Sequence, residues 1–242
     1  MDIGTAKPSK QERARVPHWG LDLVDPGQSF TAADFKQYAL EKISEIRSRH
    51  HVPLLVGGTG LYIDGVIFDY QFAPPNPILR QSLSSLSLDT LLEYCANNNI
   101  KLPENHHNKR YVMRAIERQT ISIKGLSQPI AHTAIVGITT ERDILRQQIA
   151  TRAHDMFTAG MVEEAVQLGR RYGWDSEAMT GNIYPLVHQF VDGIINKEQL
   201  MDKFITADWR LAKRQLTWLK RNPFIVWKTR DEAYTYIKNI LG

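Results

Sequence analysis

The stretch PLLVGGTGLY, from Pro53 to Tyr62, decides the fold that the rest of the sequence suggests. Its first four residues form a short apolar run, which predicts a buried parallel strand at 53–56. Two glycines end that strand, and Thr59 is a predicted N-cap of the helix that follows. The buried side of that helix is predicted to hold Leu61, Tyr62, Val66 and Ile67.

A strand that ends in glycines and leads into a helix exposes backbone N–H groups where open α/β folds bind ligands, and anions suit a helix N-terminus. A tight turn without a ligand fits the stretch equally well. The motif is neither G-x-G-x-x-G nor a Walker A loop, so it names neither a dinucleotide nor a nucleotide.

Composition is that of a soluble globular protein, with 43% hydrophobic and 23% charged residues among 242. No apolar run approaches the roughly 20 residues that cross a bilayer, and no signal peptide opens the chain. The single cysteine, Cys95, excludes an internal disulfide and a cysteine-rich zinc module and favours a reducing, cytoplasmic location. The net charge of +4 and pI of about 9.1 favour a polyanionic partner.

Strands separated by long helical stretches predict an α/β fold. The proline-rich break at 73–77 predicts that a helical insertion, 74–133, divides a core formed by 1–73 and 134–242. Residues 1–8 are predicted to be a loop. The remaining strands are predicted at 134–138 and 224–227, with a weak candidate at 18–24. Helices are predicted at 32–49, 77–85, 88–97, 107–120, 141–159, 161–172, 176–192, 197–221 and 230–241.

Two helices present basic faces. In the first, six residues fall within about 120° of one another at 100° per residue. They are Arg210, Lys213, Arg214, Thr217, Lys220 and Arg221. Because a solvated face normally mixes both signs of charge, this arc favours phosphate binding.

The second basic face carries Arg110, Arg114 and Arg118, four residues apart, opposite an apolar face. Arginine can donate two hydrogen bonds to one phosphate and can stack on an unpaired base. A plain surface helix, in which Glu117 pairs with Arg114 or Arg118, remains an equal interpretation. The histidine pairs lack carboxylates or thiols at ligand spacing, so no metal site is predicted.

Several motifs, taken in order along the chain, resemble the tRNA dimethylallyltransferase family. They are Met1-Asp2-Ile3-Gly4-Thr5-Ala6-Lys7-Pro8, Asp25-Pro26 with Ala32-Ala33-Asp34-Phe35, Val56 to Tyr62, Arg114-Ala115-Ile116-Glu117, and Ala212-Lys213-Arg214-Gln215-Leu216-Thr217-Trp218. Each motif alone is weak evidence for the family, whereas the set in this order is specific evidence for it.

This resemblance implies transfer of a dimethylallyl group from dimethylallyl diphosphate to the exocyclic amine (N6) of an adenosine. That adenosine lies 3′ of the anticodon in tRNAs that read codons beginning with U. The family uses Mg²⁺, and its fold is a P-loop-NTPase-like α/β core with a helical insertion. The chemistry requires a general base for the amine, charge stabilisation for the leaving diphosphate and an unstacked base.

Carried over residue by residue, the resemblance places Thr59, with Gly57 and Gly58, at the substrate channel. Its implied tRNA-binding residues are Arg80, Arg110, Tyr111, Val112, Met113, Arg114, Tyr184, Lys213, Arg214, Gln215, Thr217, Trp218 and Lys220, and the segment 179–184 matches a further contact.

The chain departs from the family pattern in three places. The family's G-P-T-x-x-G-K-T phosphate loop and Asp-Ser segment precede its Met-Asp-Ile-Gly motif, and both are absent from this sequence. The chain as given is therefore expected to lack the first strand, the phosphate loop and the catalytic base, and to be inactive. Asp2 and Asp34 are the nearby acids to test as substitute bases. Pro185 follows Ile183-Tyr184 where a basic residue is expected, and Trp209 replaces an expected arginine.

Three hypotheses follow for function: a tRNA dimethylallyltransferase, a non-catalytic tRNA-binding relative, or a transferase that prenylates free adenine nucleotides. Only the last would not need the two basic faces. The expected protein is a cytoplasmic monomer without membrane association.

Overall fold

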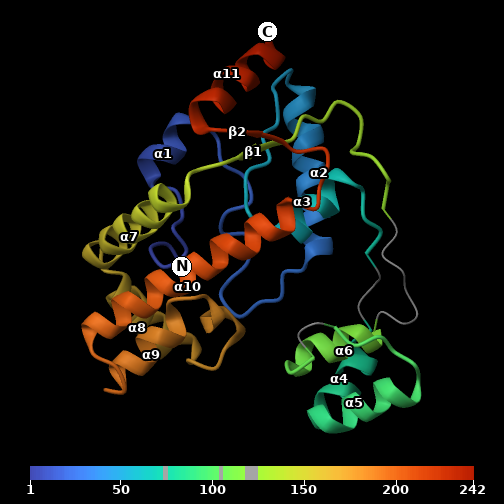
Figure 1. Cartoon of the computed structure of the whole chain (residues 1–242), viewed down its shortest axis with the longest axis vertical. Coiled ribbons are helices and arrows are strands. Elements are labelled where there is room, and N and C mark those ends of the chain that lie inside the picture. The colour runs from blue at the N-terminus through green and yellow to red at the C-terminus, as the bar shows by residue number, and fades with distance from the viewer. Residues whose placement is uncertain (73–75, 104–105, 118–124) are drawn as a thin grey trace. The chain divides into compact units, whose positions relative to one another are not determined.

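The computed structural model describes residues 1–72, 76–103, 106–117 and 125–242 (Figure 1). The chain divides into two compact units. The first joins Met1–Ile63 to Ala131–Gly242, and the second is Asp64–Ile130.

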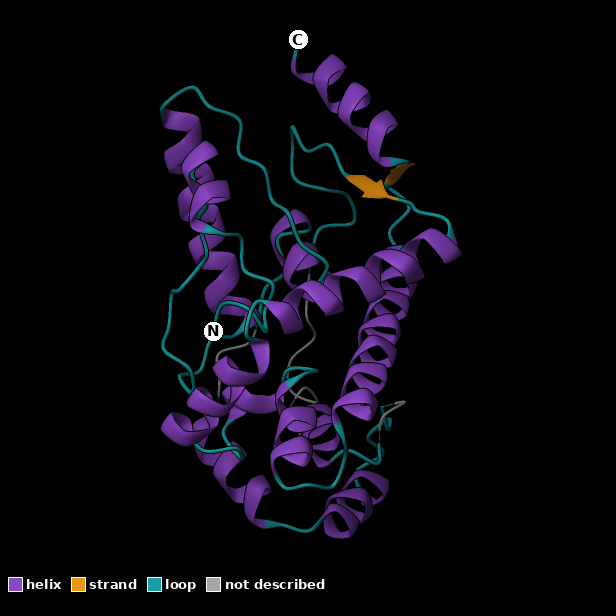
Figure 2. Cartoon of the chain, turned by 90° about the vertical axis from the view of Figure 1, so that its left-hand side faces the viewer, coloured by secondary structure: helices purple, strands orange, loops and turns teal. Residues whose placement is uncertain are grey.

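The first unit holds a two-stranded parallel sheet. Strand β1, Val136–Ile138, pairs with β2, Val226–Lys228, in the register Val136↔Val226 to Ile138↔Lys228. Parallel strands need a long crossover, and here four helices and a 3₁₀ turn lie between the two strands in sequence. Figure 2 shows how short the strands are beside the helices.

The crossover helices are α7 (Arg142–Thr158), α8 (Met161–Tyr172), η2 (Glu177–Thr180), α9 (Tyr184–Val191) and α10 (Lys197–Leu219). The unit also contains α1 (Lys10–Arg15), α2 (Ala32–Ser48), α3 (Gly60–Ile67), whose last residues fall in the second unit, and α11 (Arg230–Leu241). Helix α11 packs against both strands.

Local capping explains where the longest helices begin. Thr31 accepts a hydrogen bond from the backbone N–H of Asp34, whose carboxylate accepts one from the N–H of Thr31 at 2.8 Å. Asn196 and Gln199 make the same reciprocal pair, with both bonds at 2.9 Å, at the start of α10. Each pair satisfies donors that the first helical turn leaves without partners.

The core of the first unit lies between the crossover helices. Its buried side chains are Ala153, Met156, Met161, Ala165, Met179, Ile183, Tyr184, Val187, Ile195, Leu200 and Phe204. Met1 and Ile3 pack against this cluster from the N-terminal loop. The cluster therefore fixes the N-terminal motif to helices more than 150 residues away in sequence.

The second unit is a helical cluster of α4 (Pro77–Ser85), α5 (Leu88–Asn97) and α6 (Lys109–Glu117). Its core contains Leu83, Leu91, Cys95, Ile100, Val112 and Ile116. Cys95 is a fully buried free thiol, as expected for a packed helix residue, and burial raises its pKa.

The strand predicted at 53–56 is wrong. These residues have no regular secondary structure, and the side chains of Leu54 and Val56 are 68% and 89% exposed. An apolar run becomes a strand only when a neighbour accepts its backbone hydrogen bonds, and the described sheet contains β1 and β2 alone.

Other differences are smaller. Residues 18–24 form no strand, and the helix predicted at 176–192 is interrupted between η2 and α9. Helix α1, with a Ser9–Glu12 capping box, was not predicted. Part of the predicted helix 107–120, including Arg118, lies outside the described residues. No helix within the described ranges has the length and hydropathy needed to cross a membrane.

Candidate nucleic-acid interface

The glycine turn lies directly against the basic helix α10. A Cβ atom added to Gly58 would stand 2.5 Å from Nε2 of Gln215, and one added to Gly60 would stand 1.8 Å from Cδ1 of Trp218. Only glycine permits such close approach of backbone to side chain. The structure therefore brings the glycine turn and the basic helix into contact, although the sequence predicted them independently.

Thr59 sits between these two contacts and is exposed. Its carbonyl accepts hydrogen bonds from the N–H groups of Tyr62 at 3.0 Å and Ile63 at 3.2 Å, which starts helix α3. The Tyr62 ring packs against Phe35 of α2, with centroids 5.1 Å apart. Thr59 is thus presented at the surface by an anchored helix start, next to Gln215 and Trp218.

The basic face of α10 is exposed along its length. Five cations on α10 and the turn directly after it have no carboxylate partner among the described residues: Arg210, Lys213, Arg214, Lys220 and Arg221. The guanidinium of Arg221 lies 5.6 Å from the ring centroid of Trp218. Cations held close together without acids favour an anionic partner.

A buried carboxylate holds α10 in place. Asp208, 8% exposed, accepts a hydrogen bond of 2.6 Å from Nη2 of Arg152 on α7 and one of 3.0 Å from Nδ2 of Asn182. Because removing one member of such a group leaves a buried charge or donor without a partner, all three residues act as one unit. This unit fixes the basic helix to α7 and to the segment before α9.

Tyr184 does not form part of the exposed interface, which corrects its predicted role. Its side chain is 1% exposed and meets Gly4, where an added Cβ would stand 2.6 Å from the hydroxyl oxygen. Burial, together with the carboxylates of Glu164 and Asp2, raises the pKa of this hydroxyl well above its usual value. Tyr184 is a core residue that supports the N-terminal loop.

We therefore expect Tyr184→Phe to leave tRNA affinity unchanged. The hydroxyl has no hydrogen-bond partner within the described part of the chain, so its removal should raise the free energy of unfolding by about 1 kcal/mol. Urea unfolding and tRNA binding of the same preparation test this. Weakened binding at unchanged stability would restore Tyr184 to the interface.

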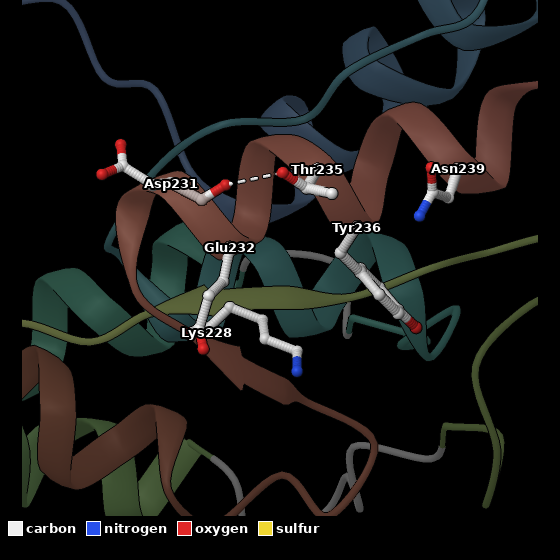
Figure 3. Close-up of a pocket in the computed structure, with 6 residues that line it drawn as sticks. All are labelled: Lys228, Asp231, Glu232, Thr235, Tyr236 and Asn239. Atoms are coloured by element: carbon white, nitrogen blue, oxygen red, sulfur yellow. Dashed lines mark hydrogen bonds between the residues drawn. The ribbon is translucent and has the colours of Figure 1, made fainter.

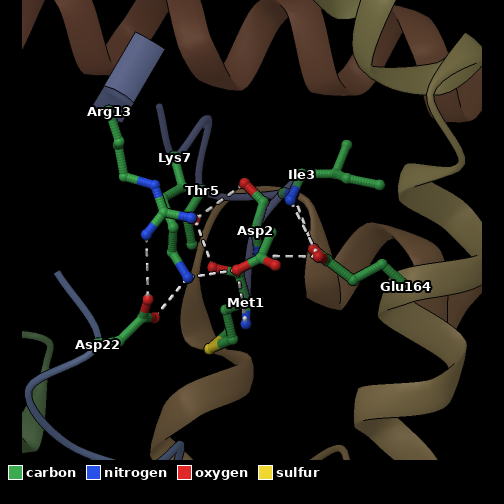
Figure 4. A network of polar contacts seen from close by, with 9 residues as sticks. Met1, Asp2, Ile3, Thr5, Lys7, Arg13, Asp22 and Glu164 are labelled. Atoms are coloured by element: carbon green, nitrogen blue, oxygen red, sulfur yellow. Dashed lines mark hydrogen bonds and ion pairs between the residues drawn. The ribbon is translucent and has the colours of Figure 1, made fainter. Parts of the chain in front are cut away.

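The backbone of the N-terminal loop is hydrogen-bonded to one carboxylate (Figure 4). Glu164, in the first turn of α8, accepts hydrogen bonds from three consecutive N–H groups: Asp2 at 2.7 Å, Ile3 at 2.9 Å and Gly4 at 2.9 Å. Sequence reasoning missed Glu164 because nothing local distinguishes it from Glu163, and its partners lie about 160 residues away.

Both candidate bases are held in other interactions. Lys7 pairs with Asp2 and also with Asp22, and its hydrogen bond lowers the pKa of the Asp2 carboxyl. Hydrogen bonds from Thr31, the N-cap of α2, lower the pKa of the Asp34 carboxyl in the first helical turn. A carboxylate with a lowered pKa is a weaker proton acceptor. Neither residue has the properties of a strong general base.

In the second unit, Arg80 forms a two-pronged pair with Glu117, with both N···O distances at 2.8 Å. The sequence had suggested Arg114 or Arg118 as partners of Glu117. Arg110 and Arg114 are exposed on α6, and Tyr111 is 43% exposed.

Burial divides the other residues predicted on α6. Met113 is half-buried. Val112 is fully buried in the core, so its side chain cannot contact tRNA, which corrects that prediction.

Two surface hollows lie away from the glycine turn. One, about 460 Å³, is lined by Lys228, Asp231, Glu232, Thr235, Tyr236 and Asn239 and includes no predicted site residue (Figure 3). The other, about 430 Å³, lies between α9 and α10 and reaches Asn182 and Arg210. It adjoins the basic face.

The described residues contain no cluster of three or more His, Cys, Asp or Glu side chains able to hold a metal ion. Asp2, the carboxylate of the N-terminal loop, is paired with Lys7. The described residues therefore do not fit a protein-built Mg²⁺ cage.

The comparisons with known proteins agree with the motifs. The IPP transferase family model matches residues 1–222. A tRNA dimethylallyltransferase of Anoxybacillus flavithermus is 34% identical over 94% of this chain and 77% of its own length, and that of Bacillus subtilis is 31% identical over the same shares.

Solved structures give the same result. The full-length tRNA isopentenylpyrophosphate transferase of Bacillus halodurans matches with a TM-score of 0.73 and 30% identity, over 100% of this chain and 82% of the other. The enzyme of Staphylococcus epidermidis matches at 0.70 and 30%, over 99% and 86%. With its motifs in order, its helix-rich α/β fold and these matches, the chain belongs to the IPP transferase family.

Proposed function

We propose that this protein transfers a dimethylallyl group from dimethylallyl diphosphate to N6 of an adenosine in tRNA. The observation that carries the proposal is the contact between the glycine turn and the basic helix: Gly58 and Gly60 lie against Gln215 and Trp218. A candidate substrate channel and a surface suited to RNA phosphates are thereby adjacent. The names of the relatives, tRNA dimethylallyltransferases, point to the same reaction.

In this reaction the N6 lone pair attacks C1 of the dimethylallyl group and a C–N bond forms. The C1–O bond breaks, and diphosphate leaves with the electron pair. N6 then loses a proton to a base, so charge and atoms balance. Because an aromatic amine is a weak nucleophile, holding both substrates in line is a large part of catalysis.

The proposed role of the described residues is binding and orientation. Thr59, at the exposed start of α3, contacts the adenine, while Gln215 and Trp218 form the adjoining wall. Lys213, Arg214, Thr217 and Lys220 bind phosphates of the anticodon stem-loop. On α6, Arg110, Tyr111 and Arg114 provide a second contact, and an unstacked base is the natural substrate for such a surface.

Further details remain proposals that rest on the family resemblance. The target is the adenosine 3′ of the anticodon in tRNAs that read codons starting with U. Mg²⁺ accompanies the diphosphate, which suits a cation that typically binds substrate phosphates and few protein ligands. The protein acts as a cytoplasmic monomer with a P-loop-like core.

The decisive test is deletion of the gene, followed by mass spectrometry of nucleosides from total tRNA. We expect N6-dimethylallyladenosine and its derivatives to disappear and to return when the gene is restored. Unchanged tRNA modification would refute the proposal. If prenylated free nucleotides disappeared instead, the protein would act on small molecules, and if purified protein bound tRNA while modification was unchanged, it would be a binding protein.

The basic face of α10 should dominate tRNA binding. We expect the double variant Lys213→Gln/Arg214→Gln to weaken binding about ten-fold or more and to lower the slope of log K against log salt by about 2, because each lost phosphate contact removes about one unit. Titration of labelled tRNA at several salt concentrations measures both.

The matched control is Arg170→Gln/Arg171→Gln, which removes two adjacent exposed cations at the end of α8. It changes net charge equally and should leave the slope near that of the wild type. Equal effects of the two variants would show that only net charge matters, and would remove the specific role of α10.

A further inference from the structure

We propose that Arg142 and Arg146 of α7, held on the ring of Trp209, form a further binding site for tRNA phosphates. The site would extend the interface from α10 onto α7. This inference rests on the proposed function, because it assumes that tRNA is the partner.

Two guanidinium groups lie over the ring of one indole. The Cζ atom of Arg146 lies 4.9 Å from the ring centroid of Trp209, and that of Arg142 lies 5.8 Å from it. Helices α7 and α10 pack along each other in the first unit (Figure 1). The Arg152–Asp208 pair, next to Trp209 in sequence, fixes the two helices in this arrangement.

Both arginines remain available to a second partner. A guanidinium carries five N–H donors, and contact of its charge with an aromatic ring leaves donors for a phosphate. Both side chains are exposed. The acids next to Arg142 in sequence are Glu141 and Asp143, and no ion pair joins either to these arginines within the described ranges.

The position of the pair makes it continuous with the basic face of α10. Arg210 directly follows Trp209 in the sequence, and Lys213 lies one helical turn after Trp209. Cations therefore flank the α7–α10 contact on both helices, and their mutual repulsion falls when a polyanion lies across it.

Trp209 also explains how the family pattern is altered here. The resemblance placed an arginine at 209, and this chain has a tryptophan. The indole supplies no charge itself, but it orders two arginines from another helix by cation–π contact. The two arginines thus bring positive charge from α7 to the start of the basic face on α10.

The test compares tRNA binding by the full chain and by Arg142→Gln/Arg146→Gln over a range of salt concentrations. We expect the dissociation constant to rise about ten-fold and the salt slope to fall by about 2. The charge-keeping variant Arg142→Lys/Arg146→Lys should recover most of the slope, which a merely structural role of the contact with Trp209 would not explain. Thermal unfolding of each variant verifies that the fold is retained.

The control is again Arg170→Gln/Arg171→Gln. If wild-type protein binds tRNA and the α7 variant behaves like this control, the inference is overturned and the proposed function stands. If the wild type itself fails to bind tRNA at low salt, the proposed function falls and the α7 site with it.

Discussion

Gly60→Ala is expected to displace Trp218 and to reduce tRNA affinity strongly. The new methyl group would lie 1.8 Å from Cδ1 and 2.2 Å from Nε1 of the indole, so the ring cannot stay where it is. Overpacking of this kind costs about 1–3 kcal/mol. Alanine in a helix gains up to about 1 kcal/mol over glycine, which at the first residue of α3 does not offset the clash.

Gly57→Ala is the matched control from the same turn. Its methyl group would meet only Cδ1 of Ile63, at 3.9 Å, which is an ordinary contact. Urea unfolding and tRNA binding of the two variants should therefore differ, with Gly57→Ala close to wild type. If Gly60→Ala binds tRNA as tightly as Gly57→Ala, the contact between the turn and α10 has no role in recognition.

Local signals were enough to predict most helices. The Thr31–Asp34 capping box begins α2 where predicted, and Asn76 with Pro77 begins α4 at the predicted residue. These signals act within one helical turn, so they are readable from neighbouring residues alone. Strand 53–56 failed for the opposite reason: a strand depends on a partner that its own sequence does not specify.

The candidate site was predictable only in parts. Spacing placed Arg210 to Arg221 on one face of a helix, and the glycines marked the turn, but no sequence rule predicted that Gly60 would meet Trp218. On α6, spacing placed an apolar face opposite the arginines, whereas the family resemblance carried Val112 over together with its exposed neighbours. Burial separates Val112 from these neighbours, because one side of the helix packs on the core and the other is in contact with solvent.

The N-terminal network could not be predicted from the sequence, because Glu164 and its partners lie about 160 residues apart. In Glu164→Gln, a carboxamide replaces a carboxylate that accepts three N–H bonds. The amide keeps one accepting oxygen and turns an NH₂ donor toward another donor. Because bonds to charged groups are the stronger ones, we expect the free energy of unfolding to fall by about 2 kcal/mol.

Glu163→Gln separates this effect from simple charge loss. Both residues lie in the first turn of α8, so each substitution removes the same favourable interaction with the helix dipole. Glu163 is exposed, and its variant should change stability by less than about 0.5 kcal/mol. Hydrogen exchange at residues 2–4 should accelerate in Glu164→Gln alone. Equal unfolding midpoints would mean that the loop is held by Ile3 and Met1 packing on the core, with the carboxylate contributing little.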